Sequence, residues 1–165
     1  MRRFTVRAKK GGLAIQALVQ EIGQDILLAI WGGTRPHIGA VGVALPRPSL
    51  EDPRKWSATS SNFTLQGHKE DLLAKQVSEK ISAALRRNIV VTAGIHWDGL
   101  DASGIQTIQT LTANLAEQVV QRFATAKKDD LARSRFQTGK VKPSNYKARK
   151  SLSFAPLTRE TKQTK

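Results

Sequence analysis

The second half of the chain contains two amphipathic helical patterns with one strand-like segment between them, and this order restricts the possible folds most strongly. Apolar residues recur every four positions between residues 73 and 85, where they form one stripe of a predicted helix. They recur every three to four positions between residues 105 and 123, in a second helix that Asp101 or Ser103 can cap. The β-branched segment at residues 89–97 predicts a strand between the two helices.

The first half of the chain consists of strand-length segments separated by Gly and Pro. We predict strands or extended structure at residues 4–8, 13–22, 26–31, 37–45 and 57–66, with a short helix as the alternative for residues 13–22. The Gly/Pro connection at residues 32–36 predicts a hairpin between the strands on either side of it. Three prolines predict a loop at residues 46–53, because proline lacks the backbone donor that a strand requires.

This order of elements predicts an α+β fold with a mostly antiparallel sheet and both amphipathic helices on one face. The other face would then be available to a second copy or to a partner. We place this domain at residues 1–126. Residues 127–165 carry most of the net charge of +14, lack helical periodicity and are rich in Lys, Ser, Thr and Arg, so we predict a basic, disordered tail.

Composition and motifs exclude several classes of function. The chain has no cysteine, and its basic N-terminus is not followed by the apolar segment of a signal peptide. No segment approaches the roughly 18 uninterrupted apolar residues of a membrane span, so we predict a cytoplasmic protein without membrane contact. The chain also lacks a Walker loop and the GxGxxG, HExxH and GxSxG motifs, and we therefore predict no catalytic residues and no metal site.

Three histidines nevertheless lie at the ends of predicted elements, where sites tend to gather. His37 follows the Gly/Pro connection, His68 begins the first helix, and His96 ends the last strand shortly before Asp98. Together they could form an acid–base or metal centre. The alternative function is therefore a small enzyme or ligand-binding domain that uses these three histidines.

Two basic regions suggest anionic ligands. Arg47 and two further basic residues precede the polar segment 57–62, and Gly67 to Lys69 lies at a helix N-terminus, where backbone N–H groups can receive an anion such as a flavin phosphate. A solvated loop explains the same residues without a ligand. The basic tail could bind nucleic acid through phosphate contacts, which gives a further alternative function.

Five motifs in order resemble one small bacterial family. They are Trp31 to Ala44 (WGGTRPHIGAVGVA), Pro46 to Leu50 (PRPSL), Ser57 to Ser61 (SATSS), Gly67 to Asp71 (GHKED) and Gly94 to Asp98 (GIHWD). Over about residues 4–124 they are similar to the D-subunit family of gallate decarboxylase, also called prenylated flavin chaperone-like domains. The same order is distantly similar to proteasome assembly chaperone 4, which implies an antiparallel sheet flanked by helices.

The resemblance implies an accessory chaperone and not an enzyme. Such a protein assists cofactor delivery to, or subunit assembly of, a prenylated-flavin-dependent decarboxylase of hydroxybenzoates. The implied cofactor is transiently bound prenylated FMN, and the expected partners are the catalytic subunit and a second copy in a homodimer. The motif positions expected to contact the cofactor are Gly33, Thr34, Pro36, His37, Arg47, Ser57, Thr59, Ser60, Gly67, His68, Lys69, Asp71, His96 and Asp98.

Overall fold

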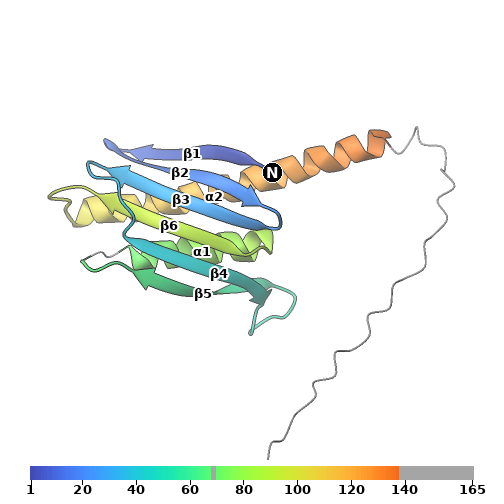
Figure 1. The fold of residues 1–165 in the computed structure, drawn as a ribbon, viewed down its shortest axis with the longest axis horizontal. Coiled ribbons are helices and arrows are strands. Elements are labelled where there is room, and N and C mark those ends of the chain that lie inside the picture. Colours follow the sequence, from blue (N-terminus) through green and yellow to red (C-terminus); the bar gives the residue numbers. More distant parts are fainter. Residues whose placement is uncertain (68–69, 138–165) are drawn as a thin grey trace, which may run out of the picture.

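The computed structural model describes residues 1–67 and 70–137, which form a six-stranded sheet with two helices on one face (Figure 1). This arrangement confirms the predicted α+β class. The elements are β1 (Arg3–Lys10), β2 (Leu13–Ile22), β3 (Asp25–Gly33), β4 (Ala40–Pro48), β5 (Trp56–Thr64), α1 (Asp71–Leu85), β6 (Ile89–His96) and α2 (Ala102–Gln137).

The strand order β1-β2-β3-β6-β4-β5 shows that the predicted hairpin between β3 and β4 is wrong. Strand β6 lies between them, parallel to β3 and antiparallel to β4, and every other neighbouring pair is antiparallel. The connection of residues 34–39 crosses the end of β6 instead of making a tight turn. Consequently β6, rich in β-branched residues, gains a hydrogen-bonded neighbour on both sides.

The core lies between the sheet and the helices. Alternate residues of the central strands face the helices and are buried, as the pleat of a strand requires. The two helical stripes bury Val77 and Ile81 from α1 and Leu115 and Val119 from α2 against them. Full burial of one such aliphatic side chain contributes roughly 1.5–3 kcal/mol, so this layer contributes strongly to stability.

Strand β4 differs from its prediction in two ways. It begins at Ala40 rather than at His37, and it continues through Pro48 where a loop was expected. The prolines are tolerated because the pairing of β4 with β6 ends at Ala44, opposite Ile89. Beyond that point β4 has only β5 as a neighbour, so it can lack some backbone donors.

The helix boundaries follow local capping. The Asp101 carboxylate accepts a hydrogen bond from the Gly104 N–H at 2.7 Å, which confirms Asp101 as the cap of α2 and lowers the pKa of that carboxyl. Helix α2 runs through Gln137, beyond the predicted boundary at residue 126. Of the predicted tail at residues 127–165, residues 138–165 lie outside the described residues. Among those described, no helix is long and apolar enough to span a membrane.

Arg87 joins the connection between α1 and β6 to the turn between β2 and β3. Its guanidinium donates to the Glu21 carboxylate at 2.8 Å and to the carbonyl oxygens of Gly23 and Gln24 at 2.8 and 2.5 Å. The hydrogen bond from Arg87 lowers the pKa of Glu21, against the opposing effect of burial. Both side chains are largely buried, so the pair is protected from solvent screening.

We predict that Glu21→Gln lowers the free energy of unfolding by about 1 kcal/mol at pH 7. The Glu21 contribution is complete above its ordinary pKa of 4.5 and is lost as the pH falls through its lower folded-state pKa. The difference between the variant and the wild type should therefore shrink below about pH 4.5. Urea unfolding at several pH values measures this, and a pH-independent difference would contradict the charged pair.

Candidate functional site

Two glycines allow the connection of residues 34–39 to lie directly on the end of β6. Gly33 has φ +90°, and a Cβ atom there would lie 1.8 Å from the carbonyl oxygen of His96. A Cβ atom on Gly94 would lie 1.9 Å from the carbonyl oxygen of His37. No side chain fits in either place, so both positions require glycine.

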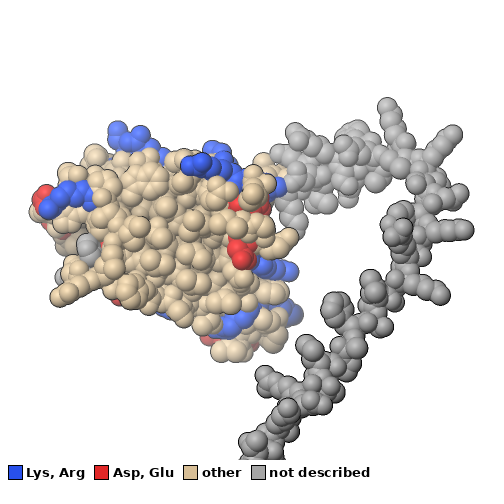
Figure 2. All heavy atoms as spheres, in the orientation of Figure 1, with Lys and Arg blue, Asp and Glu red and all other residues tan. Residues whose placement is uncertain are grey.

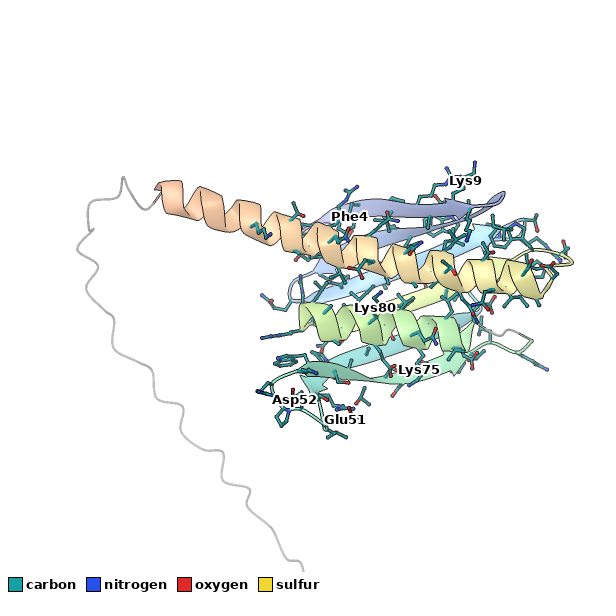
Figure 3. The ribbon with its side chains drawn as sticks, turned by 180° about the vertical axis from the view of Figure 1, so that it is seen from behind. Phe4, Lys9, Glu51, Asp52, Lys75 and Lys80 are labelled. Atoms are coloured by element: carbon teal, nitrogen blue, oxygen red, sulfur yellow. The ribbon has the colours of Figure 1, made fainter. Side chains whose placement is uncertain are left out.

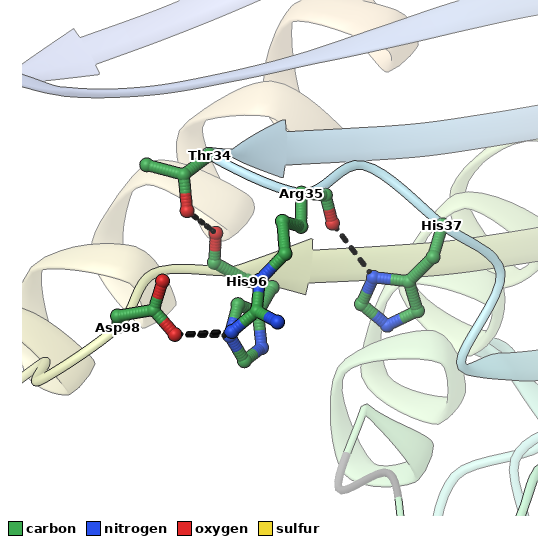
Figure 4. Close-up of polar contacts among 5 residues, drawn as sticks. All are labelled: Thr34, Arg35, His37, His96 and Asp98. Atoms are coloured by element: carbon green, nitrogen blue, oxygen red, sulfur yellow. Dashed lines mark hydrogen bonds and ion pairs between the residues drawn. The ribbon is translucent and has the colours of Figure 1, made fainter.

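Backbone hydrogen bonds hold the connection in this position. The Thr34 N–H donates to the His96 carbonyl at 2.8 Å, and the Gly39 N–H donates to the Ala93 carbonyl at 2.9 Å. Motifs that are far apart in the sequence therefore meet, and the His37 and His96 rings lie 6.3 Å apart between centroids at 70° (Figure 4).

Arg35, His96 and Asp98 form one exposed contact group (Figure 4). An Arg35 N–H lies 2.7 Å from His96 Nε2 and also donates to the Asp98 carboxylate, while His96 Nε2 lies 3.0 Å from that carboxylate. The hydrogen bond with His96, followed by the one with Arg35, lowers the pKa of Asp98.

His37 makes a more buried contact beside this group. Its Nδ1 lies 3.0 Å from the Arg35 carbonyl oxygen, and its Nε2 lies 3.2 Å from the Glu70 carboxylate at the start of α1. The same carboxylate accepts a 3.4 Å hydrogen bond from the Ile95 N–H. Gly39 leaves room for this pair, since a Cβ atom there would lie 2.6 Å from Glu70 Oε2. We call the side chains of Arg35, His37, Glu70, His96 and Asp98 the polar cluster.

The structure brings together one part of the predicted site. The predicted residues at or beside the polar cluster are Gly33, Thr34, Pro36, His37, Asp71, His96 and Asp98. Asp71 begins α1, where its carbonyl accepts from Asn62 at 3.2 Å, and Gly67 ends the turn after β5 with φ +83°. His68 and Lys69 lie outside the described residues.

A second part of the predicted site lies elsewhere. Arg47, Ser57 and Thr59 are near the far end of the β4–β5 pair, where the Arg47 guanidinium donates to the Thr59 hydroxyl at 2.7 Å. Seven strand residues separate Arg47 from the start of β4, which corresponds to roughly 23 Å. Ser60 points to the helical side and donates to Glu79 of α1 at 2.8 Å.

Two residues of the polar cluster were missed by the sequence analysis. Arg35 belongs to the motif of residues 31–44. Its position two residues before His37 could have indicated that the two side chains belong to one site. Glu70 lies at the start of a helix, where an acidic side chain interacts favourably with the helix dipole. This ordinary role gave no reason to expect a second one. The actual partner of Glu70 is His37, which only the crossing of the connection brings near.

The polar cluster offers hydrogen-bond donors and acceptors. The Thr34 hydroxyl beside it donates to the His96 carbonyl oxygen at 3.4 Å. Within residues 1–67 and 70–137 no group of three or more His, Cys, Asp or Glu side chains could hold a metal ion. The arrangement suits recognition of a polar ligand through charge-assisted hydrogen bonds.

Comparison with known protein families assigns this sequence to a family of chaperone-like domains. Residues 9–124 match the prenylated flavin chaperone LpdD-like domain, and the chain belongs to this family. Protein LpdD of Lactiplantibacillus plantarum is 28% identical over 116 residues, which cover 70% of this chain and 82% of that protein. The predicted family resemblance is therefore confirmed.

A solved chain from a chaperone complex for yeast 20S proteasome assembly is also similar. It matches with a TM-score of 0.42 and 12% identity, over 79% of this chain and 97% of that chain.

We predict that Gly94→Ala destabilises the protein by about 3 kcal/mol, because the new methyl group would overlap the His37 backbone. Gly99→Ala is the matched control. Its Cβ meets nothing within 4 Å, and it should cost only about 1 kcal/mol for its left-handed backbone at φ +69°. Thermal unfolding of the two variants measures this, and equal losses would mean that the connection does not rest on β6 as described.

Proposed function

We propose that this chain is an accessory chaperone that transiently holds prenylated FMN and passes it to the catalytic subunit of a hydroxybenzoate-type decarboxylase. It does not itself decarboxylate the substrate. Membership of the LpdD-like prenylated flavin chaperone family supports this function. The observation that carries it is the polar cluster, which gathers residues from the family-like motifs at one end of the sheet.

The exposure of the polar cluster suits a temporary ligand. The Arg35 and Asp98 side chains are 66% and 69% exposed, whereas His37 and Glu70 behind them are largely buried. A phosphate or ring carbonyl could replace Asp98 as the partner of Arg35 at little cost, because the existing contact is already solvated. The buried pair would hold the connection in place during the exchange.

We predict that Arg35→Ala weakens binding of prenylated FMN by roughly 10-fold to 100-fold, because loss of one hydrogen bond to a charged group costs about 1.5–3 kcal/mol. His37→Ala should also weaken binding while the fold remains intact, because the connection that carries Arg35 loses the His37–Glu70 contact. Fluorescence titration of the purified chain, with native mass spectrometry for stoichiometry, measures the affinity.

Arg47→Ala is the control for this experiment, since Arg47 lies at the other end of β4. A loss of binding in Arg47→Ala, with no change in Arg35→Ala, would move the site to the β4–β5 end. Unfolding of His37→Ala would instead make His37 a structural residue.

The sheet face opposite the helices is a candidate surface for protein partners. Figure 2 shows a broad area of this face without Lys, Arg, Asp or Glu, and basic residues at its margins. The strand alternation places on it Leu18, Leu27, Trp31, Val41, Val43, Leu45, Phe63 and Val90, which we call the open face. Val43, Leu45 and Phe63 are exposed large apolar residues.

We infer that a second copy of the chain covers the open face in a homodimer. A closed two-fold dimer buries the same patch on both copies, and an uncharged apolar patch lets two basic chains meet without charge repulsion at the contact. The polar cluster at the end of the sheet would remain accessible to the cofactor and to the catalytic subunit.

We predict that Phe63→Glu converts the dimer to a monomer, because each of the two copies would place a carboxylate in the apolar interface. Leu50→Glu is the matched control, since Leu50 is 87% exposed in the loop between β4 and β5. Light scattering after size-exclusion chromatography measures the mass. A monomeric wild type, or a dimeric Phe63→Glu variant, would contradict the proposed homodimer.

A further inference from the structure

A groove of about 600 Å³ separates the N-terminal halves of α1 and α2 on the helical side of the molecule. The two helices lie side by side there, and both begin at the end of the sheet that carries the polar cluster (Figure 3). Lys80 of α1, which itself lines the groove, forms a 3.2 Å ion pair with Glu117 of α2. The groove volume is within the range of small-molecule sites in proteins, roughly 300–1,000 Å³.

The walls of the groove are mainly aliphatic. Leu73 and Val77 of α1 face Ile108 of α2 across it. At its mouth, Leu72 and Ile105 are 52% and 51% exposed, an unusual state for two large apolar residues that flank one opening. An apolar ligand with a branched, saturated part would make van der Waals contacts with these walls.

Several polar side chains also line this mainly apolar groove, among them Lys80, Thr112 and two amides. Gln76 of α1 and Gln109 of α2 both line it. Each amide offers a donor and an acceptor, a combination that matches a ring carrying neighbouring carbonyl and N–H groups. An apolar groove with a few oriented polar groups is typical of a small-molecule site.

The groove is continuous with the polar cluster. Glu70 and His96 belong to both, and Trp97, directly after His96, also lines the groove. A ligand with an apolar ring system and a polar extension could therefore occupy the groove and reach the polar cluster. Prenylated FMN has this composition: a tricyclic flavin extended by a branched five-carbon unit, with a ribityl phosphate at the other end.

We propose that the groove between α1 and α2 holds the prenyl-modified ring system of the flavin, an assignment that rests on the proposed carrier function. The aliphatic walls take the added five-carbon unit, and Gln76 and Gln109 face the carbonyl and N–H edge of the ring. The ribityl phosphate extends toward the polar cluster. Selection of prenylated over plain FMN is then a property of the groove and not of the polar cluster.

A substitution that fills the groove without changing its charge tests this assignment. Ala113 lines the groove and is exposed, so Ala113→Trp should occupy the ligand space and leave the folded core unchanged. Ala124→Trp is the matched control, because Ala124 is an exposed position of α2 outside the groove lining. Both variants and the wild type are titrated with prenylated FMN and with plain FMN.

We expect Ala113→Trp to weaken binding of prenylated FMN about tenfold or more and to reduce its preference over plain FMN, since burial of the five-carbon unit is lost. Ala124→Trp should bind as the wild type does. Unchanged binding by Ala113→Trp, in a wild type that binds prenylated FMN, would overturn the groove assignment and leave the carrier function standing. A wild type that binds neither flavin would overturn the carrier function and the groove assignment together.

A second measurement covers the case in which Ala113→Trp does not fold. Methyl resonances of Ile105 and Ile108 in the unmodified chain should shift when prenylated FMN is added. Val19 is buried in the core and does not line the groove, so its methyl resonances serve as the reference. Absence of a shift at both isoleucines under saturating prenylated FMN would overturn the assignment.

Discussion

The passage of residues 34–39 across the end of β6 is the constraint on which the polar cluster depends. Strands β3 and β6 are parallel, so their ends lie at the same edge of the sheet, and β4 must return on the other side of β6. The crossing is tight enough to exclude a Cβ atom at Gly33 and at Gly94. This steric restriction, rather than a specific interaction between side chains, places the two described histidines next to each other.

The three surfaces of the domain can then serve different purposes. The open face offers apolar area to a protein, the polar cluster offers charge-assisted hydrogen bonds, and the groove offers an apolar volume. Because Glu70 contacts His37 and also lines the groove, a ligand at one of these two sites would influence the other through a single side chain. The open face lies on the opposite side of the sheet from the groove and can be covered while the ligand is bound.

Sequence periodicity was sufficient for the elements and insufficient for their pairing. The stripes of α1 and α2 and the segments of β1 to β6 are local patterns, and they were enough to find every element. The bounds of β4 and the end of α2 were not predicted correctly, since β4 continues through Pro48 and α2 through Gln137. The hairpin was wrong because the neighbour of β3 comes from a strand far along the chain. Arg47 was grouped with His37 by charge and family resemblance, yet the direction of β4 carries it to the other end of the sheet. His68 and Lys69 stay predictions, since they lie outside the described residues.

The most direct test of the carrier function is transfer of the cofactor between purified proteins. The chain is loaded with prenylated FMN, freed of excess ligand and mixed with a cofactor-free decarboxylase catalytic subunit, and native mass spectrometry follows the cofactor. We predict that the cofactor leaves this chain and appears on the catalytic subunit as decarboxylase activity rises. Activation no faster than with free prenylated FMN, or cofactor that stays on this chain, would contradict it.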